Sequence, residues 1–359
     1  MTNRTKRIIA LTLAAAACCA ALRAENWLSG LRDDTPVCRL ALPGTHNSAT
    51  GEGFRGLAGR LAGNRRARTQ DASLAEQWDS GIRVFDLRPA AVRRGRRAPF
   101  LRICHGIATT RMRFDEALRL LSRKVQENPG EFAIVIVRRE HPGRRDADEM
   151  WRKLMRECLK SAELAGRLAD FAPELTVGGL RGKILVLSRD IYEDRGCPAG
   201  GYLRGWTHSA DPERQKQALV KGTAAASCPL FVQDCYDSTR GRLGAKIAAL
   251  RAMADEGIRL AATADERPVW IINHASGYTA RSSNGYRDHA ARTNAALIYH
   301  LNDSGATAAA GIVMMDYAAA DSSKGRPVRG RELTRTLIAC NAVYAADGQT
   351  SPDERPKTE

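Results

Sequence analysis

The segment Phe132-Ala-Ile-Val-Ile-Val137, followed at once by Arg138-Arg-Glu140, decides the fold class of this chain. Its six residues are all apolar, whereas a strand with one face in water alternates apolar and polar residues. A short continuous apolar run is typical of a parallel strand that is buried on both faces. The charged residues that follow the run would stand at the carboxyl end of such a strand.

Seven more apolar runs separate longer amphipathic stretches. The candidate strands are 37–42, 82–87, 100–104, 132–137, 184–187, 230–232, 269–272 and 311–315, and helical patterns cover 114–126, 147–168, 212–225, 243–262, 286–301 and 331–343. Eight strands with intervening helices over about 300 residues predict a single α/β domain, a (β/α)₈ TIM barrel. The link from Arg88 to Pro99 has no room for a full helix, so we expect the barrel to be irregular.

Polar residues follow all eight candidate strands. In chain order they are His46, Arg88, His105, Arg138 with Glu140, Arg189, Asp234, Asn273 and Asp316. In this fold the carboxyl ends of the strands converge on one mouth, where catalytic groups collect. One such residue has a simple structural explanation, but eight together would each need solvation inside the mouth. The pattern therefore predicts an active site.

The charge balance points to an anionic partner. The 359 residues include 56 Lys and Arg against 40 Asp and Glu, a formal charge of +16. A hydrophobic content of 43% with 27% charged residues excludes wholesale disorder. Nucleic acid, an acidic membrane surface and a phosphate-bearing substrate all fit this charge.

The first residues have the pattern of an export signal. Arg4, Lys6 and Arg7 precede an uncharged apolar run that is too short to span a membrane comfortably. Cleavage after Ala24 would leave a charge of +12; the alternative is a lipoprotein signal with Cys18 or Cys19 lipidated. We predict a secretory or lipoprotein signal peptide at 1–24, a barrel domain at 25–346 and a flexible tail at 347–359.

Seven cysteines remain after that cleavage, and they are scattered without a C-x-x-C pair, so a zinc site is not expected. Export makes a disulfide possible, and Cys197, Cys228 and Cys235 are the nearest in sequence. Their odd number leaves at least one thiol free. We interpret Cys104, inside an apolar strand, as a small buried hydrophobe.

Several motifs, taken in order, resemble the bacterial phosphatidylinositol-specific phospholipases C. They are Leu42-Pro-Gly-Thr-His-Asn-Ser48, Gly81-Ile-Arg-Val-Phe-Asp-Leu-Arg88, His105-Gly106, Asn128-Pro-Gly-Glu131, Gly182-Lys-Ile-Leu-Val-Leu-Ser-Arg189, Val232-Gln-Asp-Cys-Tyr236 and Met315-Asp-Tyr317. Each motif alone is weak, but the ordered set covers about residues 36–320. The resemblance implies a distorted (β/α)₈ barrel, in agreement with the strand count.

The resemblance also implies a reaction in which the inositol 2-hydroxyl displaces diacylglycerol and gives a cyclic inositol phosphate. His46 would take the hydroxyl proton, and Asp316 would orient it and stabilise its imidazolium. His105 would protonate the leaving oxygen. Arg88 would hold the non-bridging phosphate oxygens.

Calcium is the alternative source of positive charge, since the eukaryotic relatives use it. Asn47, Asp86 and Glu140 have the residue types of three calcium ligands. Arg88, however, stands where a further carboxylate would be wanted and supplies the charge itself. We expect no cofactor and calcium-independent activity. Asn47 departs from the bacterial pattern, which usually has Asp there, so we expect activity to be lower or differently tuned.

Inositol recognition carries over to Asn47, Arg138, Arg189, Asp234 and Tyr236, with Tyr236 able to stack on the sugar ring. A salt bridge at the barrel rim is the structural alternative for each charged member. Asp86 and Glu140 could equally support Arg88 from behind. His274 could line the mouth. Ser73-Leu-Ala-Glu76 has the pattern of a capping box that opens a helix.

The expected substrates are phosphatidylinositol or glycosylphosphatidylinositol (GPI) anchors. We expect a monomer, secreted or periplasmic or lipid-anchored to the envelope, that contacts anionic membrane through clusters such as Arg93-Arg94. No nucleic-acid motif accompanies these clusters. Two alternatives stay open: a phosphodiesterase with another lipid substrate, and a barrel that binds phosphoinositides without turnover.

Overall fold

The structure is a computed structural model that describes residues 24–56, 63, 66–93, 95–96, 98–140, 145–192, 200–222, 226–236, 242–263, 267–279, 285–305 and 308–346. The predicted signal peptide (apart from Ala24), the predicted tail and Cys197 lie outside these residues, so those three predictions stay predictions. Within the described ranges, no helix is both long and apolar enough to cross a bilayer.

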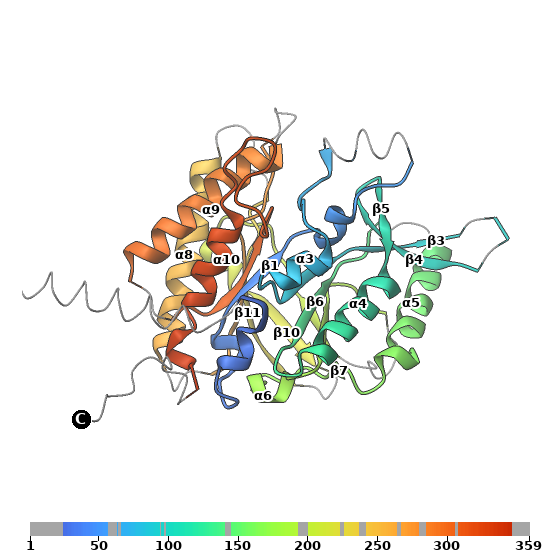
Figure 1. Cartoon of the computed structure of the whole chain (residues 1–359), viewed down its shortest axis with the longest axis horizontal. Coiled ribbons are helices and arrows are strands. Elements are labelled where there is room, and N and C mark those ends of the chain that lie inside the picture. Colours follow the sequence, from blue (N-terminus) through green and yellow to red (C-terminus); the bar gives the residue numbers. More distant parts are fainter. Residues whose placement is uncertain are drawn as a thin grey trace, which may run out of the picture.

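A ring of nine strands forms the centre of the described chain (Figure 1). In spatial order the strands are β6 (Ala133–Val137), β2 (Val84–Leu87), β1 (Ala41–Thr45), β13 (Gly311–Met315), β12 (Trp270–His274), β11 (Ser227–Gln233), β10 (Ala218–Gly222), β9 (Gly201–Arg204) and β8 (Ile184–Ser188). Pairing of β6 with β8 closes the ring, and the short β7 (Leu168–Ala169) adds to β8 from outside. The prediction of a single irregular α/β barrel is confirmed.

The predicted strand 100–104 does not belong to the barrel. It forms β4 (Phe100–His105), which pairs antiparallel with β3 (Pro89–Val92) and β5 (Ala108–Arg113) in a separate sheet. A parallel strand needs a long crossover connection, and the short link after Arg88 does not provide one. The chain therefore folds back as hairpins, and Gly106, with φ of 54°, forms the turn after His105.

The predicted helix 212–225 is wrong over most of its length. Only α7 (Pro212–Gln215) is helical, and the next segment is β10. In β10, Ala218 and Val220 are buried while Leu219 and Lys221 are exposed, which is the period of a strand. This strand runs antiparallel to β9 and β11 and, with the unpredicted β9, raises the ring to nine.

The other predicted helices are present, with small shifts at their ends except in one case: the predicted helix 147–168 ends at Leu159, and the rest of that range contains a 3-10 turn and the start of β7. They are α4 (Phe114–Glu127), α5 (Arg145–Leu159), α8 (Leu243–Ala262), α9 (Gly285–Asp303) and α10 (Gly330–Ala339). In Figure 1, α8, α9 and α10 cover one side of the barrel and α4 and α5 the other. The predicted capping box is confirmed: Ser73 and Glu76 exchange two hydrogen bonds at the start of α3 (Leu74–Asp79).

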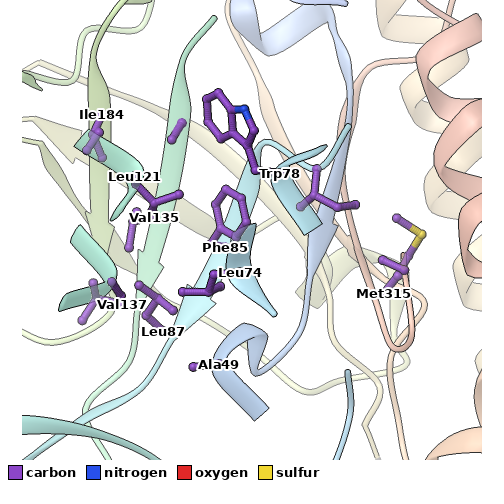
Figure 2. Close-up of a cluster of buried hydrophobic side chains, with 14 of the residues drawn as sticks. Ala49, Leu74, Trp78, Phe85, Leu87, Leu121, Val135, Val137, Ile184 and Met315 are labelled. Atoms are coloured by element: carbon purple, nitrogen blue, oxygen red, sulfur yellow. The ribbon is translucent and has the colours of Figure 1, made fainter. Parts of the chain in front are cut away.

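Burial on both faces explains the continuous apolar runs. Along β6, Ile134 and Ile136 belong to the cluster that fills the barrel. Their neighbours Val135 and Val137 belong to a second cluster, between the barrel and its helices, with Phe85 of β2 and Leu121 of α4 (Figure 2). β6 thus separates two apolar layers, and its carboxyl end is the first place along it where polar side chains are accommodated.

Candidate active site

His46 and Asp316 meet because their strands are neighbours in register. Thr45, the last residue of β1, pairs with Met315, the last residue of β13, so the next residue of each strand lies beside the other. The His46 Nδ1–H donates to Asp316 Oδ1 over 2.8 Å, and both side chains are buried. Asp316 Oδ2 accepts a second bond from the Gly277 N–H at 3.2 Å. The predicted base and its carboxylate partner are therefore brought together.

The side chain of Asn47 contacts the other ring nitrogen of His46, Nε2. Its Nδ2 lies 2.9 Å from His46 Nε2, and its Oδ1 is buried with no partner among the described residues. Asn47 has φ of 47°, a left-handed conformation that Asn tolerates better than most residues. An amide donor at Nε2 and a carboxylate at Nδ1 assign the tautomer with its proton on Nδ1. The lone pair on Nε2 is the basic site.

Burial keeps this imidazole neutral. Burial first, and then the positive charge of Arg88, lowers the pKa of His46 to about 3. Burial also raises the pKa of Asp316, although the Gly277 N–H opposes this rise. Near neutral pH His46 is thus in the form that accepts a proton.

Arg88, just after β2, is held by Asp86 of the same strand. Its Nη2 donates to Asp86 Oδ2 over 2.9 Å, and its Nε donates to the same carboxylate. Burial alone would lower the pKa of Arg88, but the Asp86 carboxylate outweighs burial and raises it. Asp86 Oδ2 also accepts from the Asn47 N–H at 3.0 Å. One carboxylate therefore fixes the guanidinium relative to the loop that carries His46.

His105 reaches the site from the separate sheet rather than from a barrel strand. Its ring centroid lies 6.1 Å from that of His46. Its Nδ1 lies 2.7 Å from the Ala67 carbonyl oxygen, so Nδ1 donates and Nε2 faces the site. Burial first, and then Arg88 and His46, lowers the pKa of His105 to about 3. As a general acid, His105 would need a bound anion to favour its protonated form.

Glu140 does not reach Arg88 by a hydrogen bond or ion pair; its Oε1 accepts from the Gly106 N–H in the turn after His105. Its position after β6 therefore steadies the hairpin of the second histidine. Asp86, the other predicted support, does contact Arg88.

Tyr286, near the start of α9, is a site residue that the sequence interpretation missed. Its hydroxyl lies 3.4 Å from His105 Nε2 and 2.9 Å from the Tyr236 hydroxyl. Tyr236 in turn packs edge-on to His46, with ring centroids 6.1 Å apart. A tyrosine on a helix carries no motif of its own, so only the contact with His105 identifies it.

The remaining predicted residues line the other half of the mouth. Asp234 accepts from Trp206 Nε1 at 2.9 Å and lies 3.1 Å from His208 Nδ1. Arg189 stacks over the Trp206 ring, 4.0 Å from its centroid. Arg138 shares a cavity wall with Arg189. The structure thus brings all the predicted site residues to one end of the barrel, although Glu140 faces the hairpin.

Two more buried groups lie near the site: Lys246, which the sequence interpretation missed, and His274, which it placed at the mouth. Lys246 of α8 is buried, donates to Gln233 Oε1 over 3.1 Å, and has its pKa lowered to about 8 by burial. His274 of β12 lies 6.1 Å, between ring centroids, from His46. A Lys inside an amphipathic helix is normally read as solvent-facing, so sequence alone hides Lys246.

Metal binding finds no support in the side-chain grouping. Across the described ranges, no group of three or more His, Cys, Asp or Glu side chains could hold a metal ion. Of the three possible calcium ligands, Asp86 is bonded to Arg88 and Glu140 to Gly106.

Comparison with known proteins gives two kinds of similarity. The 1-phosphatidylinositol phosphodiesterase of Listeria monocytogenes is 26% identical over 167 residues, which cover 46% of this chain and 49% of that protein. The chain thus spans about half the length of the curated relative it matches. No protein-family model matches.

The fold similarity extends much further than the sequence similarity. A double mutant of the phosphatidylinositol-specific phospholipase C of Staphylococcus aureus aligns with a TM-score of 0.68 at 17% identity, over 88% of this chain and 97% of that one. The Listeria monocytogenes enzyme aligns with a TM-score of 0.62 at 19% identity, over 89% and 99%. The chain therefore has the irregular TIM-barrel fold of these proteins. The resemblance to the bacterial phosphatidylinositol-specific phospholipases C is confirmed in sequence and in fold.

Proposed function

We propose that this protein is an exported phosphodiesterase that cleaves phosphatidylinositol, or the same linkage in GPI anchors, to diacylglycerol and a cyclic inositol phosphate. One observation carries the proposal. Two imidazole rings, those of His46 and His105, lie close together at the mouth of the barrel, with centroids 6.1 Å apart. His46 is hydrogen-bonded to the buried carboxylate of Asp316, and burial, followed by the positive charge of Arg88, lowers the pKa of both histidines. A base, an acid and a fixed cation are what internal attack on a phosphodiester requires.

The reaction uses the substrate's own nucleophile. His46 Nε2 accepts the proton of the inositol 2-hydroxyl, whose oxygen then attacks phosphorus. The bond from phosphorus to the diacylglycerol oxygen breaks, and that oxygen takes a proton from His105 Nε2. Asp316 stabilises the imidazolium of His46, and Arg88 holds the non-bridging oxygens through the transition state. The Asn47 amide leaves Nε2 when the hydroxyl arrives.

Arg88 replaces a metal ion in this scheme. A guanidinium locked by Asp86 supplies a positive charge in a buried site, where it acts strongly on a developing anion. We therefore propose activity that needs no calcium.

The rim next to His105 suits a peripheral contact with anionic membrane. Ile107, in the turn after His105, is 97% exposed. Exposed Arg55 lies close by, since its N–H donates to the carbonyl of Thr109. An apolar tip with a cation beside it favours contact with an anionic lipid surface. We further propose that the protein is a monomer and that it acts outside the cytoplasm, either free or lipid-anchored.

One assay tests the proposal. The protein expressed from residue 25 onward is incubated with phosphatidylinositol vesicles in EDTA, and cyclic inositol phosphate is followed by phosphorus NMR. The expected result is product formation in EDTA. No product with or without calcium would reject the enzyme, and product only with calcium would reject the role of Arg88.

The two histidines provide the matched variants. We expect His46→Ala and His105→Ala each to lower turnover by at least about 100-fold, because each removes one general acid or base. Circular dichroism should show an unchanged fold. His300→Ala is the control, since this partly exposed histidine in the last turn of α9 pairs with Asp255 of α8 and belongs to no predicted site motif. A near-normal rate in either active-site variant would show that the acid and base are misassigned.

A further inference from the structure

Lys246 is a buried cation that the proposed reaction does not use. It lies in the first turn of α8, and only 2% of its surface is exposed. Its Nζ donates to Gln233 Oε1 over 3.1 Å, the one hydrogen bond that the ammonium forms within the described ranges. An ammonium has three N–H donors. Burying such a group costs free energy unless it is paired and hydrogen-bonded, so its position needs an explanation.

Stability alone does not explain a lysine at this position. The amino end of a helix carries partial positive charge, so a cation in the first turn is unfavourable. A buried ion also loses its hydration, and an apolar side chain of similar volume is often as stable or more so. Further along the same helix, the buried positions Leu250 and Met253 are apolar. The charge of Lys246 must therefore be explained by the groups around it.

Gln233 connects this ammonium to the carboxyl ends of two barrel strands. Gln233 is the last residue of β11, and its Oε1 also accepts from the Cys235 N–H at 2.9 Å. Its Nε2 donates to the carbonyl oxygen of His274, the last residue of β12, at 3.0 Å. Lys246 thus lies beneath the ends of β11 and β12, and β12 is the ring neighbour of β13, which leads to Asp316.

Two buried carboxylates, Asp234 and Asp316, lie at this end of the barrel. Within the part of the chain that the structure describes, neither has a lysine or arginine at salt-bridge distance. Asp316 pairs with His46, whereas Asp234 lies near His208 and His274. Burial lowers the pKa of His46 and His274 to about 3, so neither is positively charged near neutral pH. The cation that keeps Asp316 ionised must therefore act from further away.

The charge of Lys246 acts on both members of the catalytic pair. Burial raises the pKa of Asp316, and among the influences that oppose this rise Lys246 follows the Gly277 N–H and precedes Arg88. Burial lowers the pKa of His46, and the charges of Arg88 and Lys246 lower it further. The titratable groups that interact with this ammonium are Asp234, Cys235, Asp316, His46, His274 and His289.

We propose that Lys246 is a positioning residue for the catalytic base: its ammonium holds Asp316 in the carboxylate form, in which Asp316 orients His46 and stabilises the imidazolium that forms during the reaction. The inference rests on the proposed function, in which His46 accepts the proton of the attacking hydroxyl. Lys246 acts through Asp316 and is neither a proton donor nor a proton acceptor in the reaction.

Removal of the charge at nearly constant side-chain volume tests the inference. Lys246→Met should raise the pKa of both Asp316 and His46, because the ammonium lowers both. The base works when His46 is neutral and Asp316 is ionised. Whichever of the two sets the acidic limb of kcat/KM, that limb should therefore move up by about one pH unit.

The alkaline side of the profile identifies the charge as the cause. Burial lowers the pKa of wild-type Lys246 to about 8. Above about pH 9 both proteins therefore lack the charge, and their profiles should meet. A loss of activity of the same size at every pH would show a merely structural role for Lys246 and overturn the inference.

Two further variants separate the charge from other effects. Lys246→Gln keeps an N–H donor for Gln233 without the charge, and should move the acidic limb as Lys246→Met does. Lys153→Met removes an equal charge from α5, where the side chain is 69% exposed, and should leave the limb in place. Thermal unfolding should verify that each variant folds. A limb that stays in place in Lys246→Gln, or that moves equally in Lys153→Met, overturns the inference.

Histidine NMR titration of His46 gives a readout that needs no turnover. We expect the pKa of His46 to rise by about one pH unit in Lys246→Met and Lys246→Gln and to stay unchanged in Lys153→Met. No rise overturns the inference, even if phosphatidylinositol is cleaved. A rise in a protein that cleaves no phosphatidylinositol would support the action of Lys246 on the pair and reject the proposed function.

Discussion

His46 has one hydrogen-bond partner on each ring nitrogen, and the two partners have different consequences. Asp316 on Nδ1 selects the tautomer and prepares the site for an imidazolium. Asn47 on Nε2 occupies the position that the substrate hydroxyl would take. Displacing a neutral amide costs about one ordinary hydrogen bond, about 1 kcal/mol. Without substrate, Asn47 therefore covers the basic nitrogen of His46, and its displacement by the substrate hydroxyl costs little free energy.

Asn47→Asp should make His46 more basic. A carboxylate at this position favours the imidazolium, so the pKa of His46 should rise from its lowered value of about 3. We expect the acidic limb of kcat/KM to move up by about one pH unit, and histidine NMR titration should show the same shift. Asn47→Ala, which removes the amide without adding charge, is the control. An unmoved limb in Asn47→Asp would contradict this account.

Tyr286→Phe should affect the chemical step rather than binding. The hydroxyl lies 3.4 Å from His105 Nε2, the nitrogen that would protonate the leaving oxygen. Loss of one such contact should lower kcat about 5-fold with little change in KM. Tyr236→Phe is the matched comparison, because Tyr236 is expected to contact the sugar and should raise KM instead. A change in KM alone for Tyr286→Phe would contradict this prediction.

At the scale of elements, the barrel depends on one buried ion pair beneath β2 and β6. Arg83 Nε donates to Glu131 Oε2 over 2.8 Å, and both side chains have 0% exposure. Glu131 Oε1 also accepts from the Ser29 N–H at 2.8 Å. This pair, together with the bond to Ser29, therefore joins the two strands to the segment that precedes the barrel.

Glu131→Gln should lower the free energy of unfolding by about 3 kcal/mol, because it leaves the Arg83 charge buried without its counter-ion. Urea unfolding measures the loss. Asp79→Asn is the matched control, since Asp79 and Lys124 form a pair that is partly exposed and should contribute less than about 1 kcal/mol. Equal losses in the two variants would contradict the importance of burial.

At the scale of the whole molecule, three buried histidines and the partly buried His105 make stability depend on pH. Burial lowers the pKa of His46, His105, His274 and His289 to about 3 each, whereas an unfolded chain has about 6.5. The unfolded state therefore binds more protons between about pH 3 and 6.5. The stabilisation is complete above this window and is lost as the pH falls through it. The raised pKa values of Asp316 and Glu52 oppose this trend, but they are two groups against four.

Urea midpoints at pH 7, 6 and 5 should therefore decrease steadily. Each histidine contributes up to about 1.4 kcal/mol per pH unit. His289 is a suitable probe because neither of its ring nitrogens has a hydrogen-bond partner among the described residues. His289→Leu should reduce the slope whatever its effect on the midpoint itself. A profile that stays flat from pH 7 to pH 5 would contradict this prediction.

The interior of the barrel and the residues at its mouth could be predicted because both depend on local pattern and chain order. Six apolar residues before Arg138 predict a doubly buried strand, and repetition of this pattern predicts a barrel. The predictions failed where neighbours in space overrode the local pattern. The segment predicted as one helix from residue 212 begins with the short α7 and continues as the strand β10. The strand β4 lies outside the ring because the link after Arg88 is too short for a crossover connection.

By itself, then, the sequence determined the fold class, the mouth and the residue types of the reaction: two histidines, a carboxylate and an arginine. Only the tertiary structure decided their partners. Asp316 is 270 positions from His46 and Tyr286 is 181 from His105, so no local pattern relates them. The contacts of a side chain depend on which strands and helices pack together, and that packing is a property of the whole chain.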